Sequence, residues 1–230
     1  MINKHPDSTY LMEYAAGSLS LAPGIAITTH LQFCDHCRRT IDNLQEIGGE
    51  LLDSSASTPV SETLLDAVLD RIDNDVQLEA PRNTSKTGIP LPDEVDKNID
   101  ELAQSVPVYI QRFLPEGKLN WRFLSPSLKV AAISVGEAIH ELAFHKIKAG
   151  GKAPEHDHRG TEITVVLKGS FSDEDGIYQP GDFMVRQAGD IHQPIAAQNE
   201  ECICLSVLAA PIRLTGIKGI LNPFLGFAPG

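Results

Sequence analysis

Two groups of potential metal ligands stand far apart in this 230-residue sequence, and their chemistry differs. The first follows a His-x3-Cys-x2-Cys pattern near the N-terminus and comprises His30, Cys34 and Cys37. The second follows a His-x-His-x3-Glu pattern with a later histidine and comprises His156, His158, Glu162 and His192. Thiolates with imidazoles suit a closed zinc site, whereas imidazoles with a carboxylate can leave a coordination position open. The sequence therefore predicts a structural metal module joined to a sensor or a catalyst.

The first pattern predicts three ligands that converge on one point. His30 and Cys34 are four residues apart and project from the same side of a helix, while Cys37 begins the next element. The fourth ligand is His5, His36 or a more distant residue; His36 stands between the cysteines and would strain the loop, so we expect His5. Such a zinc site can contribute on the order of 10 kcal/mol to folding. The alternative is a pair of buried core cysteines beside a hydrogen-bonded surface histidine.

The second pattern predicts ligands that face one side of a strand. His156 and His158 alternate by two, Glu162 keeps the same inward parity, and His192 arrives from a later strand. Three imidazoles and a carboxylate suit Zn, Mn, Fe or Ni, and the residues alone do not choose among them. The alternatives are exposed histidines in a charged loop and, for the glutamate, a salt bridge to Arg159. The remaining histidines of this half, His140 and His145, are expected at the surface or in a satisfied core.

The first ligand group requires a helical framework, which we expect over residues 1–80. Asp7 and Ser8 can cap a helix over 10–19, Pro23 can open a second that ends near 33, and Asp35 can cap a third over 36–53. A fourth is expected over 61–73. Apolar side chains at helical spacing mark the last two helices: Ile41, Leu44, Ile47 and Leu51 or Leu52, then Leu64, Leu65, Val68 and Ile72. We expect these helices to share a small apolar core that the metal stabilises.

The second ligand group requires strands, which we expect over residues 106–230. Alternating or short apolar runs predict strands at 106–113, 128–135, 140–147, 162–171, 181–186 and 202–210. Many short strands with turn signals between them indicate a sandwich or a small antiparallel barrel. Residues 81–105 have the polar, proline- and glycine-containing composition of a linker that would let the halves act semi-independently. The apolar, glycine-rich stretch 216–230 fits no element that we can assign.

Charge and hydropathy narrow the possible partners. Residues 1–80 hold 13 acidic and 4 basic side chains within a chain of net charge −12, so direct DNA binding is not expected and a basic protein surface is the better candidate. The chain has no apolar run long enough to cross a bilayer and no signal peptide at its start, which predicts a cytoplasmic protein that does not engage the membrane. Four cysteines in such a protein favour metal or thiol chemistry over disulfides.

Cys202 and Cys204 form a second cysteine pair within a predicted strand. Because residues two apart on a strand face the same side, their thiols should lie close together. They could respond to oxidation. Two apolar thiols in the barrel core are at least as good an interpretation, since the residues around them are apolar.

The segment Gly150-x5-His156-x-His158-x3-Glu162-x6-Gly169 resembles the first cupin motif at every fixed position, and Gly189-x2-His192 resembles the second. The second motif usually has a proline two residues before its glycine and an asparagine four after its histidine, where this chain has Gln187 and Ala196. That departure weakens an inference of a standard cupin oxygenase.

Together, the His-x3-Cys-x2-Cys pattern in an acidic helical region, the linker and the cupin motif resemble the ChrR family of zinc-dependent anti-sigma factors over nearly the whole chain. The resemblance implies that the helical domain binds an extracytoplasmic-function sigma factor and that the cupin domain is needed for release under singlet-oxygen-type stress. It implies a structural zinc on His5, His30, Cys34 and Cys37, and a cupin metal on His156, His158, Glu162 and His192. It implies no catalytic residue.

Two other classes of function remain open at this stage. The first is a metal-dependent cupin dioxygenase or related enzyme whose helical domain serves assembly, supported by the potentially open second site. The second is a zinc-stabilised binding module for another basic protein. A stable complex with a sigma factor that is lost with the N-terminal zinc is required only by the anti-sigma hypothesis.

Overall fold

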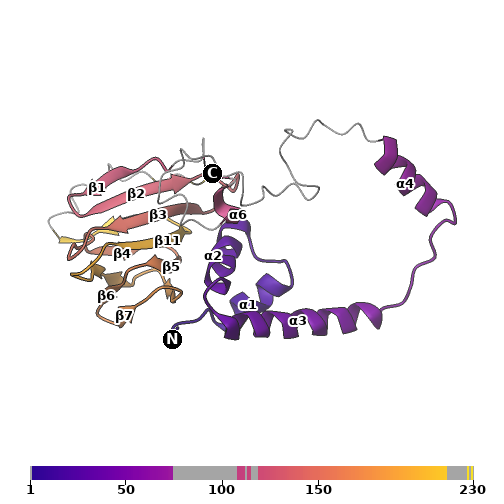
Figure 1. The fold of residues 1–230 in the computed structure, drawn as a ribbon, viewed down its shortest axis with the longest axis horizontal. Coiled ribbons are helices and arrows are strands. Elements are labelled where there is room, and N and C mark those ends of the chain that lie inside the picture. The colour runs from indigo at the N-terminus through magenta and orange to yellow at the C-terminus, as the bar shows by residue number, and fades with distance from the viewer. Residues whose placement is uncertain are drawn as a thin grey trace.

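The computed structural model describes residues 2–74, 108–111, 113–114, 119–216, 227 and 229. A helical N-terminal region is followed by a set of antiparallel strands (Figure 1), as expected from the sequence. The predicted linker 81–105 and most of the stretch 216–230 lie outside the described residues, so the three domain boundaries remain predictions. No helix in the described part of the chain is long and apolar enough to cross a membrane.

The four predicted helices are present, with shifted boundaries. They are α1 (Ser8–Ala15), α2 (Leu21–Leu31), α3 (Asp35–Asp53) and α4 (Leu64–Asn74). The Asp7 side chain caps α1 by accepting hydrogen bonds from the backbone amides of Thr9 and Tyr10. Helix α2 starts earlier than expected, and Pro23 lies within its first turn, where a backbone N–H would have no partner inside the helix. The cap of α3 is Cys34 rather than Asp35, since the Cys34 sulfur accepts from the Cys37 amide.

The prediction that all four helices share one apolar core is wrong. Ile41 of α3 is buried, but the later apolar side chains of its stripe are exposed, and so are those of α4: Ile47, Leu51, Leu52, Leu64, Leu65, Val68, Leu69 and Ile72. Helix α4 and the far end of α3 extend away from the rest of the molecule (Figure 1). Helical periodicity correctly predicted amphipathic helices, yet it could not say whether this chain itself covers their apolar sides.

The strands in the described residues form three antiparallel sheets. The first has six strands in the order β1-β2-β3-β11-β5-β8. Its strands are β1 (Arg122–Ser125), β2 (Leu128–Ile133), β3 (Glu141–Ile147), β5 (Glu162–Lys168), β8 (Phe183–Arg186) and β11 (Cys202–Leu208). The second sheet comprises β10 (Ile195–Ala196), β6 (Phe171–Asp173) and β7 (Gly176–Tyr178), and the third comprises β12 (Ile212–Leu214), β4 (His156–His158) and β9 (Ile191–His192).

Two strand predictions need correction. The run 106–113 was expected to be a strand, but its described part contains the short helix α6 (Val108–Gln111), whose Ile110 is fully buried. The run 162–171 divides into β5 and the start of β6, because the chain turns at Gly169, which has φ +68°. A Cβ at this glycine would meet the backbone oxygen of Glu201 at 2.2 Å, so a larger residue would displace the neighbouring chain.

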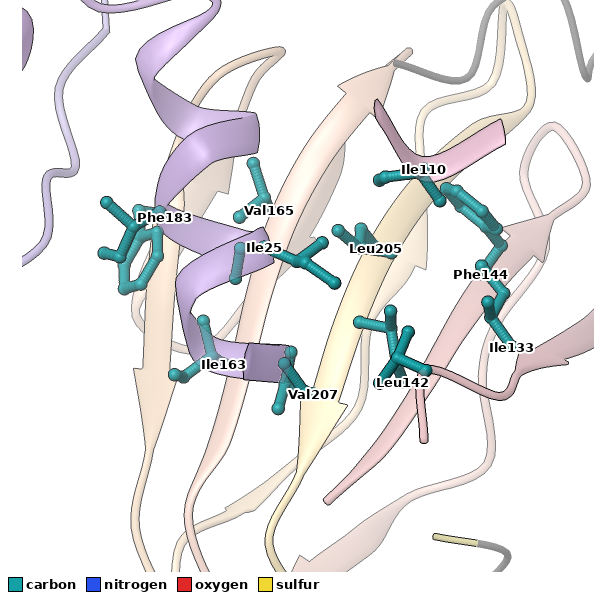
Figure 2. Close-up of a cluster of buried hydrophobic side chains, with 14 of the residues drawn as sticks. Ile25, Ile110, Ile133, Leu142, Phe144, Ile163, Val165, Phe183, Leu205 and Val207 are labelled. Carbon is teal, nitrogen blue, oxygen red and sulfur yellow. The ribbon is translucent and has the colours of Figure 1, made fainter. Parts of the chain in front are cut away.

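The central strands β5 and β11 of the six-stranded sheet are buried on both faces, which explains why their sequences are apolar runs. Figure 2 shows α2 and α6 against one face, with Ile25 and Ile110 near side chains of β5, β11 and β3. Inward-facing side chains of the opposite face form a second cluster that includes Val130, Phe171 and Met184. The helical region and the sheet therefore share one hydrophobic core, which a pair of semi-independent halves would not have.

Candidate metal centres

The N-terminal ligand group is assembled as the spacing predicted. His5, from the segment before α1, joins His30 at the end of α2 and Cys34 and Cys37 at the start of α3. One ligand atom from each of the four lies within 4.8 Å of the others. The His5 Nδ1 atom is 3.3 Å from the Cys34 sulfur and 3.5 Å from the Cys37 sulfur. His36, the alternative fourth ligand, is exposed and lies outside this group, although its ring is near that of His5.

The surroundings of this group fit a metal ion. His30 donates from Nδ1 to the backbone oxygen of Gly181 at 2.6 Å, which directs Nε2 toward the group. That Nε2 atom is buried and has no hydrogen-bond partner among the described residues, as expected of an atom reserved for a metal. Burial and the neighbouring Cys34 raise the pKa of Cys37 to about 12, so two thiolates would need a cation between them.

The second ligand group lies on three strands of residues 119–216, called the cupin region here because this part carries the cupin-like motifs. His156 and His158 are on β4, Glu162 begins β5, and His192 ends β9, where it pairs directly with His156. All four side chains are buried, and one ligand atom from each lies within 4.8 Å of the others. Glu162 therefore faces inward rather than forming the alternative salt bridge with Arg159.

Each histidine of this group is oriented by a hydrogen bond from its Nδ1 atom. His156 donates to the Pro154 oxygen at 2.9 Å, and His158 donates to the Asp190 oxygen at 2.7 Å. His192 donates to the Asp173 carboxylate at 3.0 Å. All three Nε2 atoms thereby point toward the centre of the group. This is the arrangement in which imidazoles bind metals, and it was not readable from the ligand spacing.

The charges of the second group are balanced internally. Burial works to raise the pKa of Glu162, but hydrogen bonds from His156 and His158 outweigh it and hold the pKa well below its usual value. Burial works to lower the pKa of His158, whereas Glu162, 2.5 Å from its Nε2, raises that pKa. A divalent cation would take the place of the shared proton. With one carboxylate and three neutral imidazoles, the loaded centre would carry a net charge near +1.

The remaining predicted residues are placed as follows. Cys202 and Cys204 are both buried, and their sulfur atoms lie 3.6 Å apart. The hydrogen bond with Cys202, together with burial, raises the pKa of Cys204 well above its usual value, which favours the interpretation as core thiols. His140 pairs with Glu137, and His145 is 3.3 Å from the Ser206 hydroxyl, so neither histidine joins a ligand group.

A turn of the cupin region holds the N-terminal ligands in place. The buried Asp182 carboxylate accepts hydrogen bonds from the backbone amides of Asn3 at 2.9 Å and Lys4 at 3.2 Å, immediately before His5. The next residue, Phe183, donates its amide to the Lys4 oxygen. Together with the bond from His30 to Gly181, these contacts position two of the four N-terminal ligands from the other half of the chain.

Glu137, also from the cupin region, caps a helix of the N-terminal region. Its carboxylate accepts from the Ala22 amide at 2.7 Å in the first turn of α2, where the Ser20 side chain makes no capping bond. A carboxylate at this position satisfies an otherwise unpaired donor and the helix dipole. Neither Glu137 nor Asp182 belongs to a recognisable motif, so no signal in the sequence could have identified them.

One strand contacts the surroundings of both groups. Strand β8 begins directly after the Gly181–Asp182 turn and ends at Arg186. The Arg186 guanidinium pairs at 2.6 Å with the Asp173 carboxylate, which is fully buried and also accepts from His192. A continuous set of contacts therefore runs from the second ligand group along β8 to the first.

Comparisons with known proteins support this two-part architecture. Residues 114–210 match the model of a family described as a ChrR cupin-like domain. The chain is 32% identical to the anti-sigma-E factor ChrR of Cereibacter sphaeroides over 97% of its own length and 98% of that protein. It also resembles a chain in the crystal structure of Rhodobacter sphaeroides SigE in complex with the anti-sigma ChrR, with 28% identity, a TM-score of 0.71, and coverage of 90% of this chain and 100% of that one.

Proposed function

The chain belongs to the ChrR family, and on that premise we propose that it is an anti-sigma factor that binds and inhibits an extracytoplasmic-function sigma factor. The observation that carries the proposal is the combination of similarity over almost the entire chain with the exposed apolar sides of α4 and of the end of α3. The name of the curated relative describes a regulator, which supports a regulatory role over the alternative of a cupin dioxygenase.

Helix α4 is the part of the proposed binding surface that can be described residue by residue. Leu65, Val68 and Ile72 lie along one side of it and are 67%, 46% and 66% exposed. Acidic side chains, including Asp66 and Asp70, alternate with them along the helix. An amphipathic helix of this kind can enter an apolar groove, while its carboxylates face the basic surfaces that a sigma factor uses for DNA and polymerase.

The proposal assigns zinc to the N-terminal group and a divalent transition metal, Zn, Mn, Fe or Ni, to the cupin group. Two thiolates and two imidazoles form a closed tetrahedral set, which zinc prefers in structural sites. His5, His30, Cys34 and Cys37 would hold it and thereby fasten α1, α2 and α3 together. His156, His158, Glu162 and His192 would hold the cupin ion, which would supply a Lewis-acidic position inside the domain.

Release of the sigma factor under oxidative stress of the singlet-oxygen type is the second part of the proposal. The contacts from Gly181 and Asp182 to the N-terminal ligands support it, because a change in the cupin region would reach the helical region through them. Cys202 and Cys204 are candidate oxidation sites despite their burial. If they serve this role, the Cys202→Ser/Cys204→Ser variant will retain sigma binding but lose release in cells exposed to oxidant; unchanged release would eliminate the pair.

The proposed function is tested by co-purification with an extracytoplasmic-function sigma factor encoded beside the gene of this protein. The affinity of the two proteins for each other is then measured. We expect the Leu65→Asp/Val68→Asp variant to bind the sigma factor at least about 100-fold more weakly, because two aliphatic side chains would no longer be buried in the complex. Ala67→Asp adds one aspartate, in place of two, on the other side of α4 and should change the affinity little. A wild-type protein that contains its N-terminal zinc but forms no complex would contradict the proposal.

A further inference from the structure

An apolar cavity of about 270 Å³ lies inside the cupin region against the second ligand group. Its walls are mainly aliphatic and aromatic, and they include Leu128, Val130, Phe171, Met184 and Leu214. His156, Glu162 and His192 form part of the same wall. A concave apolar space with a few convergent polar groups is the usual form of a small-molecule site, and this one is close to the common size range.

The cavity has two chemically different ends. At one end lies the His–Glu ligand group. There Thr164 donates a hydrogen bond to Glu162 at 3.0 Å, and the Nε2 atoms of His156 and His192 face each other. The lining also includes Phe123 and Leu124 of β1, which are 73% and 39% exposed and so mark the opening to solvent. Arg122, exposed beside them, places a positive charge at this opening.

We propose that this cavity binds a medium-chain monocarboxylate, with its carboxylate on the cupin metal and its hydrocarbon tail along the apolar wall. The loaded metal centre would carry a net charge near +1, and a metal that takes more than four ligands, such as Mn, Fe or Ni, would offer a position for an oxyanion head group. The tail would remove the exposed apolar side chains at the opening from water. Arg122 places a positive charge at the opening, but the Glu141 carboxylate also lines the cavity, so the head group is assigned from the metal centre and not from the opening.

The position of the cavity gives such a ligand a regulatory consequence. Strand β11 forms part of the wall through Cys204, whose side chain faces inward. Its neighbour Leu205 and the next outward residue, Val207, belong to the core that contains α2. A bound tail therefore lies on one side of the strand whose other side supports the metal-binding helix. The inference rests on the proposed cupin metal and does not depend on sigma binding.

Isothermal titration of the full-length, metal-analysed protein with acetate, butanoate, hexanoate and octanoate tests the inference. We expect the affinity to rise about fourfold for each added methylene group, the increment that burial of one methylene supplies. Equal affinities along the series would overturn it, since the carboxylate alone would then account for binding. So would the absence of octanoate binding at millimolar concentration to protein that contains its cupin metal.

A variant that fills the cavity supplies the second arm of the test. Val130→Phe should weaken octanoate binding at least tenfold and leave acetate binding unchanged, whereas Ile177→Phe, at an exposed position of β7 outside the lining, should change neither. Unaltered octanoate affinity in a folded Val130→Phe protein would contradict the proposal, and if that variant does not fold, the chain-length series decides. Metal analysis separates the failures, because a cupin region that takes up no metal contradicts the metal site itself.

Discussion

Replacing Cys37 by serine is expected to remove the N-terminal metal and to release α1 and the start of α3 from α2, which stays packed on the sheet. The four ligands come from the segment before α1, from α2 and from the start of α3, so the metal would add to the packing between these elements on the order of 10 kcal/mol for a zinc site of this type. Serine keeps the volume of cysteine but does not provide a thiolate. Metal content by mass spectrometry and limited proteolysis of residues 2–53 should show both losses.

Two matched variants make this result specific. Cys202→Ser changes another buried thiol that lies outside the ligand group and should leave the N-terminal metal in place. His5→Ala should release the metal, whereas His36→Ala should not, because the His5 Nδ1 atom adjoins both sulfurs and His36 is exposed. Metal retained in Cys37→Ser, or lost in His36→Ala but not in His5→Ala, would contradict the assigned set.

Replacing Asp173 by asparagine is expected to cost the cupin region about 3 kcal/mol of unfolding free energy, because it leaves the Arg186 charge without its buried partner. The same change removes the acceptor that orients His192, so cupin metal affinity should fall about 10-fold to 100-fold. Asp175→Asn removes another carboxylate that pairs with Arg186, but that side chain is 56% exposed and the cost should be below about 1 kcal/mol. Denaturation of metal-free protein, followed by the fluorescence of the single tryptophan, measures the loss of unfolding free energy in both variants.

The pH dependence of this difference has a defined sign. Burial works to raise the pKa of Asp173, but hydrogen bonds from His192 and Arg186 outweigh it and lower the pKa to about 2, compared with 3.8 for the free side chain. A lowered folded-state pKa stabilises the protein above the unfolded-state pKa, and this stability is lost as the pH falls. The difference between wild type and Asp173→Asn should therefore be full above about pH 4 and shrink between pH 4 and pH 2. A constant difference would contradict the pairing.

Three ligands of each group could be predicted from the sequence because their geometry is local, whereas His5 and His192 come from distant segments. His30, Cys34 and Cys37 lie within one helix end and the next helix start, and the period of a strand places His156 and His158 on one side. The same local rules predicted the four helices and most long strands of the six-stranded sheet. They failed at residues 108–111, where a β-branched, apolar run forms a helical turn because tertiary packing buries Ile110 there.

The tertiary structure decided what these elements pack against. Helical periodicity cannot distinguish an apolar side that covers this chain's own sheet, as Ile25 of α2 does, from one left open to a partner, as Leu65 of α4 is, because both satisfy the same spacing. The positioning contacts of Glu137, Asp173 and Asp182 were equally unpredictable, since each pairs with groups far away in sequence. Local spacing determined which residues could bind metal in this protein, while long-range packing determined that the two metal-binding groups share one connected framework.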